Sequence, residues 1–538
     1  MVGASFSWHS VGLTTQIKSK THWRIDEADL TLIRVGSKLT CPFSLEPCND
    51  FQPIERNLIM SGLCGVVSKG NCSETLLFGT DYHSHLGNEL AGMAVCGESF
   101  TKKIRDISKG QFKSRFEEDY PRMLGGMGIG VISDKDAQPL LIHSRFGTYA
   151  LAVAGFVENK NELTQMLFQR GAVFTETSGR GINSIEILAK LIEKGEDFTS
   201  GLEIVFDYIQ GSASMLALTR DGVYAVRDRL GRTPLILGER EDGAYMVATE
   251  RSALMNLDFD PIRELGPGEI VFIQEGKYRT LRPPRQLCQT CAFLWIYTGY
   301  PASCYEGVSV EQVRERCGAF LAKRDTVEVD LVAGVPDSGM GHAVGYAMES
   351  RIPLRRPLVK YTPGYGRSYI PPTQIIRDHV AKMKLIAVPE IIKGNRVLIC
   401  EDSIVRGTQL KNFTVKKLWN AGAKEVHVRS ACPPPMFPCR FALSTRSVDE
   451  LITRRAINDI EGEVTENIEK YLDPDSPEYA KMIDWICKHL DVTTLRYQRL
   501  DDMIEAIGLP KDRICHYCWT GESEEYNANS RQEKLDLL

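Results

Sequence analysis

Residues 397–408 carry the residue types best suited to chemistry in this chain. An apolar run, Val397 to Cys400, ends in two adjacent acids, Glu401 and Asp402, followed by a turn that opens a predicted helix near Thr408. Adjacent carboxylates at a strand end can accept hydrogen bonds from two ribose hydroxyls, and the amides of such a turn can bind a phosphate. The segment predicts a sugar-phosphate site. An N-capped strand-to-helix turn is the alternative, which explains any two of these residues but not the whole string.

Cysteine pairs are a second set of residues that could do chemistry. Cys288 and Cys291 form one pair with two residues between them, and Cys515 and Cys518 form another. Two such pairs can supply four thiolates to a zinc ion. From spacing alone, a zinc site and buried cysteines without a ligand both remain open.

Composition limits the kinds of ligand. The chain has 538 residues and a formal net charge of -5, so it lacks the broad basic field that duplex nucleic acid requires. No apolar run approaches the roughly 18 residues of a membrane span, and the first 30 positions hold no apolar signal core. We expect a cytoplasmic protein that binds small molecules and neither nucleic acid nor membrane. Its 15 cysteines should then be mostly reduced.

The hydrophobic pattern changes near Pro283-Pro284, which predicts a domain boundary. Residues 64–285 contain short strand-like runs interrupted by two helical patterns, typical of an α+β sandwich. After the boundary, strands near 328–335, 396–400 and 425–430 alternate with helices near 341–349 and 408–420, the rhythm of a parallel sheet. We expect domains at 64–285 and 286–460 and a helical C-terminal tail at 461–538. Residues 1–63 are interpreted as a removable leader or as lying before the true start.

The string at 397–408 resembles the signature of type I phosphoribosyltransferases, and its Ser-Ile-Val-Arg-Gly-Thr core resembles the glutamine phosphoribosylpyrophosphate amidotransferase family. Residues 335–339 resemble that family's pyrophosphate loop, residues 360–370 its closing loop, and residues 382–385 also match. The resemblance implies binding of 5-phosphoribosyl pyrophosphate with Mg²⁺, with Lys360 and Arg367 acting as catalytic groups that close over the pyrophosphate. The implied substrate-binding residues are Asp337, Ser338, Gly339, Glu401, Asp402, Ser403, Ile404, Val405, Arg406, Gly407 and Thr408, with Glu401 and Asp402 facing the magnesium through the ligand.

Two departures from this family pattern stand out. The closing loop is one residue longer than the family's and lacks its first arginine, which puts loop closure in doubt. Glu401 stands where the family has aspartate, so the carboxylate is kept on a longer arm.

The family resemblance also extends to cysteines. Three segments resemble the ligand segments of the iron–sulfur branch of the family. One begins at Cys291, one contains Cys439, and one runs from Cys515 to Cys518. The resemblance implies a [4Fe–4S] cluster held by Cys291, Cys439, Cys515 and Cys518. This cluster would have a structural or redox-sensing role and would tie the two domains to the tail.

The amino-terminal half resembles class II glutamine amidotransferases, whose fold is an N-terminal-nucleophile αββα sandwich. Segments 224–235, 248–250 and 267–271 look like that domain, and Cys64, in Cys64-Gly-Val-Val, is the candidate nucleophile, which would need a free α-amine as its base. Three substrate motifs depart from the family: residues 130–134 replace the segment with the carboxylate-binding arginine, 153–155 replace His-Asn-Gly, and 183–186 replace Ser-Asp-Thr-Glu. Loss of one oxyanion donor typically costs about 10²–10³ in rate. We therefore expect an impaired glutaminase site.

Three functions remain compatible with these patterns. The first is transfer of ammonia to 5-phosphoribosyl pyrophosphate to form 5-phosphoribosylamine, the first step of purine nucleotide synthesis, by a homo-oligomeric enzyme. The second is the same transfer from glutamine, with unfamiliar residues in the glutaminase pocket. The third is a non-catalytic regulator that binds the phosphosugar or a nucleotide.

Overall fold

The computed structural model describes residues 61–134, 136–178, 181–361, 385–441 and 447–522. Most of the proposed leader, and Arg367 in the closing loop, lie outside the described residues. No helix in the described ranges is long and apolar enough to cross a membrane.

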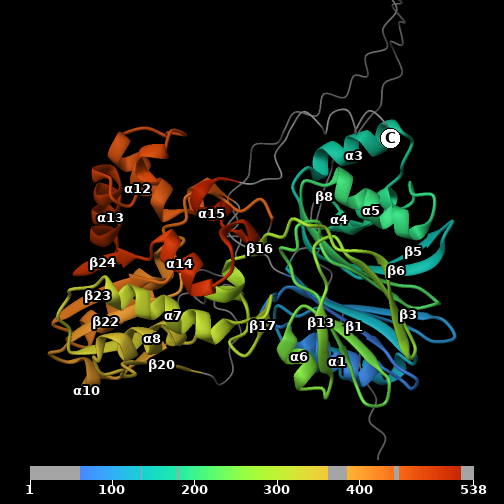
Figure 1. Ribbon diagram of the computed structural model, residues 1–538, viewed down its shortest axis with the longest axis horizontal. Coiled ribbons are helices and arrows are strands. Elements are labelled where there is room, and N and C mark those ends of the chain that lie inside the picture. The colour runs from blue at the N-terminus through green and yellow to red at the C-terminus, as the bar shows by residue number, and fades with distance from the viewer. Residues whose placement is uncertain (1–60, 135, 179–180, 362–384, 442–446, 523–538) are drawn as a thin grey trace, which may run out of the picture. The chain divides into compact units, whose positions relative to one another are not determined.

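Two stacked antiparallel sheets form the first domain (Figure 1). One sheet contains, in spatial order, β13 (Asp260–Glu264), β11 (Ile236–Glu239), β12 (Tyr245–Ala248), β1 (Ser61–Val67), β4 (Met127–Ser133), β2 (Leu90–Cys96) and β3 (Phe100–Asp106). The other contains β15 (Lys277–Arg282), β14 (Ile270–Gln274), β10 (Val223–Val226), β9 (Gly211–Leu218), β6 (Gly147–Val157) and β5 (Leu140–Ser144). A two-stranded ladder joins β7 (Thr177–Ser178) to β8 (Gly181–Ile182).

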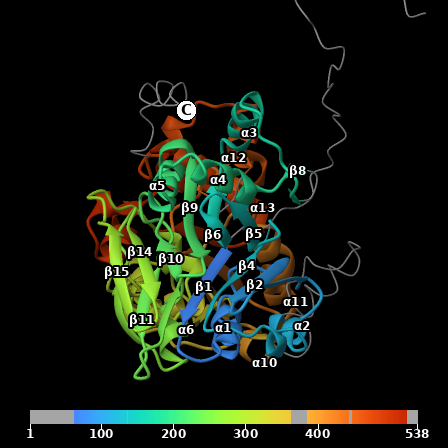
Figure 2. The ribbon, with the colours of Figure 1, turned by 90° about the vertical axis from the view of Figure 1, so that its right-hand side faces the viewer.

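Helices cover the outer face of each sheet, as Figure 2 shows from the side. Side chains of α1 (Ser73–Asp81), α2 (Phe112–Phe116) and α6 (Arg251–Met255) share one apolar core with the β1 sheet. Side chains of α3 (Lys160–Gln169), α4 (Ser184–Ile192) and α5 (Phe198–Tyr208) share another with the β6 sheet. A third core lies between the sheets. The expected αββα sandwich is therefore confirmed.

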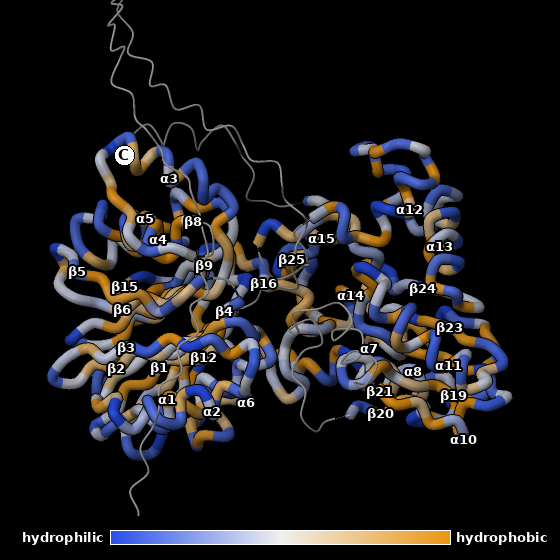
Figure 3. The backbone as a smooth tube through the Cα atoms, turned by 180° about the vertical axis from the view of Figure 1, so that it is seen from behind, coloured by the Kyte–Doolittle hydropathy of each residue, from blue (hydrophilic) through white to orange (hydrophobic). Residues whose placement is uncertain are grey.

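Strand β1 shows why the sandwich has this layering. Leu63 and Val67 belong to the core between the sheets, whereas Cys64 and Val66 belong to the core under α1. Successive side chains of a strand point to opposite faces, so an apolar strand such as β1 can contribute side chains to the cores on both sides of its sheet. Figure 3 shows hydrophobic residues running along such strands.

A four-stranded parallel sheet forms the second domain, with the order β19 (Leu331–Gly334), β22 (Arg396–Glu401), β23 (Glu425–Ser430) and β24 (Thr494–Tyr497). The alternating helices are α7 (Val310–Lys323), α8 (Met340–Ser350), α10 (Pro389–Ile392), the π-helix η3 (Leu410–Val415), α11 (Lys416–Asn420), α12 (Ile452–Glu461), α13 (Pro477–Leu490) and α14 (Leu500–Ile507). The parallel sheet expected from the sequence is confirmed. Strand β24 corrects the interpretation of 461–538 as wholly helical, because this short segment pairs with β23.

Shorter elements complete the second domain and its junction with the first. They are β16 (Thr290–Cys291) paired with β25 (Ile514–Cys515), the π-helix η2 (Leu294–Thr298), β17 (Cys304–Tyr305) paired with β18 (Val308–Ser309), β20 (Leu358–Lys360) paired with β21 (Leu385–Ala387), and α15 (Tyr517–Thr520). The pairing of β16 with β25 brings the start of the second domain beside the C-terminal segment.

Glycines allow α7 and α8 to pack closely beneath the parallel sheet. A Cβ on Gly318 would lie 1.9 Å from the carbonyl oxygen of His342, and one on Gly345 would lie 1.8 Å from that of Glu315. Both contacts are with backbone, which cannot move aside as a side chain can. The position of α8, which follows the predicted pyrophosphate loop, depends on this spacing.

Gly318→Ala should lower the free energy of unfolding by about 2 kcal/mol, because overpacking against a rigid backbone outweighs the better helix propensity of alanine. Urea denaturation would measure it. Gly70→Ala is the matched control, since nothing lies within 4 Å of its added Cβ. Equal midpoints for the two variants would contradict this account of helix packing.

Candidate active site

The two predicted phosphosugar segments meet at the carboxyl edge of the parallel sheet. Gly334 of β19 lies opposite Cys400 of β22, and the Val335 amide donates to the Cys400 carbonyl at 3.0 Å. The loop at 336–339 and the acids at 401–402 therefore follow neighbouring strand ends. Gly339 is required there, because a Cβ would lie 2.3 Å from the Cys400 carbonyl oxygen.

Glu401, which is half-buried, and Asp402, which is buried, form a pair of adjacent acids. The Ser403 hydroxyl donates to Asp402 Oδ1 at 2.6 Å, and Ser338 also bonds the Asp402 carboxylate. Glu401 Oε2 is buried with no hydrogen-bond partner. Burial, and for Glu401 also the charge of Asp402, raises the pKa of both carboxyls. The pair thus retains acceptor capacity that ligand hydroxyls can fill.

The turn that follows the acids is held in place by the helical layer. Gly407 has a φ of +71°, and a Cβ there would lie 2.6 Å from Ile452 Cδ1. The Ile452 amide donates to the Val405 carbonyl at 2.7 Å, and Arg406 forms an ion pair with Glu450. Ile404 is buried and Thr408 is exposed at the first helical residue. A turn of this kind directs backbone amides toward an anion.

Of the two predicted closing residues, the structure describes Lys360. Its ammonium forms an ion pair with the exposed carboxylate of Asp337, in the predicted pyrophosphate loop. The structure therefore brings one predicted catalytic residue beside a predicted substrate-binding residue.

The placement of Cys64 does not support its prediction as a nucleophile. Its side chain is fully buried under α1, beside Cys72 and the Thr80 hydroxyl. Burial raises the pKa of the Cys64 thiol far above its usual value. A nucleophilic cysteine needs an accessible thiolate, whereas the described residues enclose the Cys64 side chain.

Residues of the three altered glutaminase motifs line one small cavity, and Ser61, which was not among the predicted site residues, lines it too. The cavity has a volume of about 20 Å³, and its lining includes Ser61, Ser133, Gly155 and Ser184. Such a space holds about one water molecule, whereas ligand pockets usually measure hundreds of Å³. The signal that could have found Ser61 is its place at the start of β1, three residues before Cys64.

Side chains of the chain itself fill the space around this cavity. Gln138 bonds both backbone groups of Val153, with its amide donating at 3.0 Å and its carbonyl accepting at 2.7 Å. The Asn183 side chain accepts from the Ile185 amide and donates to the Ala137 carbonyl, each at 2.9 Å. These bonds occupy both backbone groups of Val153 and the Ala137 carbonyl next to the cavity lining.

Four cysteines from three distant segments lie together at an apolar core of the second domain. Cys291 and Cys515 are register partners in the β16–β25 ladder, and the thiols of Cys439 and Cys518 share a hydrogen bond. Burial raises the pKa of the Cys291 thiol, and the hydrogen bond with Cys439, followed by burial, raises the pKa of the Cys518 thiol; charge repulsion from the neighbouring cysteines adds to both. Cys288 instead contacts the Thr290 hydroxyl at 3.5 Å. The structure therefore assembles the set implied by the family resemblance rather than the two sequence pairs.

The donor chemistry of these thiols fits a thiolate-bound metal centre. Within the described ranges, however, no three acidic, histidine or cysteine side chains surround a point closely enough to hold a metal ion as placed. The four cysteines are neighbours without being closed around an ion.

Glu401→Gln should raise the free energy of unfolding at pH 7.5 by on the order of 1 kcal/mol. A carboxyl whose folded pKa is raised destabilises the fold as pH rises above its usual value of 4.5, and glutamine removes that term. Urea denaturation at several pH values should show the difference shrinking toward pH 4.5. The exposed Glu390→Gln is the control, and a pH-independent difference would contradict the charged pair.

Comparisons with known proteins agree with both domains. A glutamine amidotransferase domain model matches residues 127–256. The amidophosphoribosyltransferase of Archaeoglobus fulgidus is 35% identical over 407 residues, covering 72% of this chain and 87% of that protein. The enzyme of that name from Methanocaldococcus jannaschii is 29% identical, covering 86% and 97%. The structure of glutamine phosphoribosylpyrophosphate amidotransferase from B. subtilis, complexed with ADP and GMP, matches with a TM-score of 0.74 and 28% identity, covering 87% of this chain and 98% of that one. The chain belongs to the amidophosphoribosyltransferase family.

Proposed function

We propose that this chain transfers the nitrogen of ammonia to 5-phosphoribosyl pyrophosphate, forming 5-phosphoribosylamine and releasing pyrophosphate, the step that opens purine nucleotide synthesis. The observation that carries this proposal is the juxtaposition of the adjacent acids Glu401 and Asp402 with the loop 336–339 at one sheet edge. Membership in the amidophosphoribosyltransferase family supports the same reaction.

Each part of the site has a role in this reaction. Glu401 and Asp402 accept hydrogen bonds from the ribose hydroxyls, and the amides of residues 403–408 hold the 5′-phosphate. Asp337, Ser338 and Gly339 lie where the pyrophosphate departs, with Lys360 beside them. A Mg²⁺ ion bound with the pyrophosphate would offset its charge near the acids, and the open acceptor Glu401 Oε2 is compatible with this.

Ammonia attacks the anomeric carbon as the bond to pyrophosphate breaks, and the configuration at that carbon inverts. The nitrogen supplies the electron pair, pyrophosphate leaves with the pair of the broken bond, and the amine loses a proton to solvent. The protein contributes alignment and charge neutralisation rather than a covalent intermediate.

Ammonia rather than glutamine is the proposed nitrogen donor. The cavity of about 20 Å³ at the altered motifs is too small for a glutamine side chain. Ser61, not a cysteine, lies at the β1 position that reaches this cavity, and Cys64 is buried on the other face of the sheet. The first domain then acts as a scaffold.

Anaerobically purified full-length protein should release pyrophosphate from 5-phosphoribosyl pyrophosphate and Mg²⁺ when ammonium is added. Glutamine at the same concentration should support less than about a tenth of that rate, because oxyanion and carboxylate partners are missing. A coupled pyrophosphate assay with glutamate detection measures both. The variant Asp402→Asn should lower the ammonium-dependent rate by about 100-fold.

The other outcomes separate the competing functions. Glutamate release that matches pyrophosphate release would show an active glutaminase and contradict the choice of ammonia. Tight binding of the phosphosugar with no pyrophosphate release from either nitrogen source would contradict the enzyme proposal and support a regulator.

We also propose that Cys291, Cys439, Cys515 and Cys518 hold a [4Fe–4S] cluster that fastens the C-terminal segment to the domain core. Support comes from the mutual proximity of the four thiols and from one apolar cluster that contains Cys291, Cys439 and Cys518 and packs against Cys515. A zinc ion is the alternative occupant of the same ligands.

Anaerobic protein should contain about four irons and four sulfides per chain and show a broad visible charge-transfer band. Cys518→Ser should lose most of both and unfold at lower temperature, since the metal fastens the tail. Cys487→Ser, a half-buried cysteine of α13 outside this set, is the control. Stoichiometric zinc without sulfide would overturn the cluster assignment.

A further inference from the structure

A fully buried arginine of the first domain lies against the four-cysteine set of the second. Arg232 has no exposed side-chain surface, and its guanidinium carbon sits 3.4 Å from the centroid of the Phe441 ring. The same side chain hydrogen-bonds the Cys515 thiol and approaches Gln289 Oε1 at 3.4 Å. Phe441 follows Cys439 by two residues, and its amide donates to the Cys439 sulfur at 3.4 Å. The guanidinium therefore contacts the Cys515 thiol directly and the Phe441 ring next to Cys439.

The backbone around Arg232 binds a third cysteine. The Cys291 amide donates to the Arg232 carbonyl at 3.4 Å, and the Gln289 amide donates to the Leu230 carbonyl at 2.6 Å. The loop 227–233 thus lies along β16, and Arg232 reaches across to β25 with its side chain.

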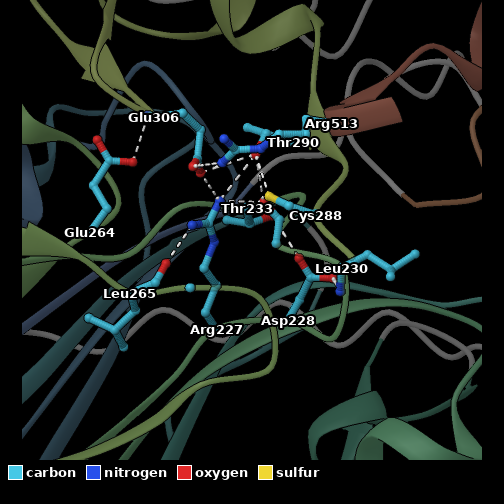
Figure 4. A network of polar contacts seen from close by, with 12 residues as sticks. Arg227, Asp228, Leu230, Thr233, Glu264, Leu265, Cys288, Thr290, Glu306 and Arg513 are labelled. Carbon is cyan, nitrogen blue, oxygen red and sulfur yellow. Dashed lines mark hydrogen bonds and ion pairs between the residues drawn. The ribbon is translucent and has the colours of Figure 1, made fainter. Parts of the chain in front are cut away.

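A second buried arginine of the same loop anchors it to the C-terminal segment (Figure 4). Arg227 donates to the Gly231 carbonyl at 2.6 Å, which braces the loop from within, and it forms an ion pair with Glu306. The other carboxylate oxygen of Glu306 pairs with Arg513 at 3.2 Å. Since Arg513 precedes Cys515 by two residues, this network holds in position both the loop 227–233 and the strand β25 that carries Cys515.

We infer that Arg232 is part of the four-cysteine site, where it supplies a fixed positive charge from the first domain to an anionic, thiolate-bound metal centre. This inference rests on the metal centre proposed above. Four thiolates outweigh the charge of the metal core they bind, so the assembled centre is a net anion in an apolar core. A buried anion needs a partner of opposite charge and hydrogen bonds to its ligand atoms, and Arg232 offers both at Cys515.

Arg232 is a positioning residue in this account, because it acts on the ligand sulfur rather than on substrate. A guanidinium that donates to a ligand sulfur favours the more negative, reduced state of the centre and so raises its reduction potential. The first domain would then keep a structural task even where its own cavity admits no glutamine.

The test compares full-length wild type with Arg232→Gln, Arg232→Lys and the control Arg229→Gln, a half-buried arginine of the same loop. All are purified anaerobically, and iron, sulfide and zinc are counted. The reduction potential is measured by spectroelectrochemistry, and bleaching of the visible band is followed in air. A role confined to packing would leave the reduction potential unmoved.

Arg232→Gln should shift the reduction potential to lower values and bleach about tenfold faster than Arg229→Gln, with Arg232→Lys between them. Equal potentials and equal bleaching in Arg232→Gln and wild type would overturn the role of Arg232 while leaving the metal centre intact. Wild type that holds zinc in place of iron has no such potential and would overturn the proposed role of Arg232, and wild type without either metal would overturn the metal centre as well. If Arg232→Gln does not fold, the test rests on Arg232→Lys. A reduction potential and a bleaching rate equal to those of Arg229→Gln would then contradict the inference.

Discussion

Two like-charged carboxylates, Glu401 and Asp402, lie side by side at the end of β22, and the proposed chemistry depends on the structure tolerating them. Ser403 and Ser338 bond Asp402, and the buried Arg314 contributes opposite charge. Glu401 Oε2 is left without a protein partner. A buried acceptor without a protein partner favours binding of a ligand that can donate a hydrogen bond to it, because that bond removes the cost of the unpaired oxygen.

That arrangement requires a parallel sheet. Adjacent parallel strands end at the same edge, so the pairing of β19 with β22 places the loop 336–339 beside the acids without further constraint. The close approach of α7 and α8 at Gly318 and Gly345 then sets where the loop after β19 must turn. Sheet pairing and helix packing together determine the geometry of the site.

The first domain keeps the expected sandwich although three of its motifs differ in sequence from the glutaminase pattern. Its two sheets keep their apolar cores, and Gln138 and Asn183 bond the backbone of Val153 and Ala137 beside these motifs. The loop 227–233 of the same domain meanwhile supplies two buried arginines to the junction with the second domain. Through these buried arginines the first domain contributes to the packing of the second.

Several features followed from local sequence. The acids at 401–402, the turn that needs Gly407 and the alternation of strands and helices were predictable because each depends on residues near one another in the chain. Short β24 was missed, because four residues carry too little periodicity and its pairing with β23 comes from packing.

Other features were decided only by the tertiary structure. Ser61 and Cys64 are three residues apart on one strand, so they face opposite sides of the sheet, and only the packed layers show which side holds the cavity. Likewise, the family resemblance implied that Cys439 joins Cys291 and Cys518, but nothing in the sequence indicated that Arg232 joins them from another domain. Such groupings bring together segments hundreds of residues apart, and no local pattern encodes contacts that arise only when separate apolar cores close on one another.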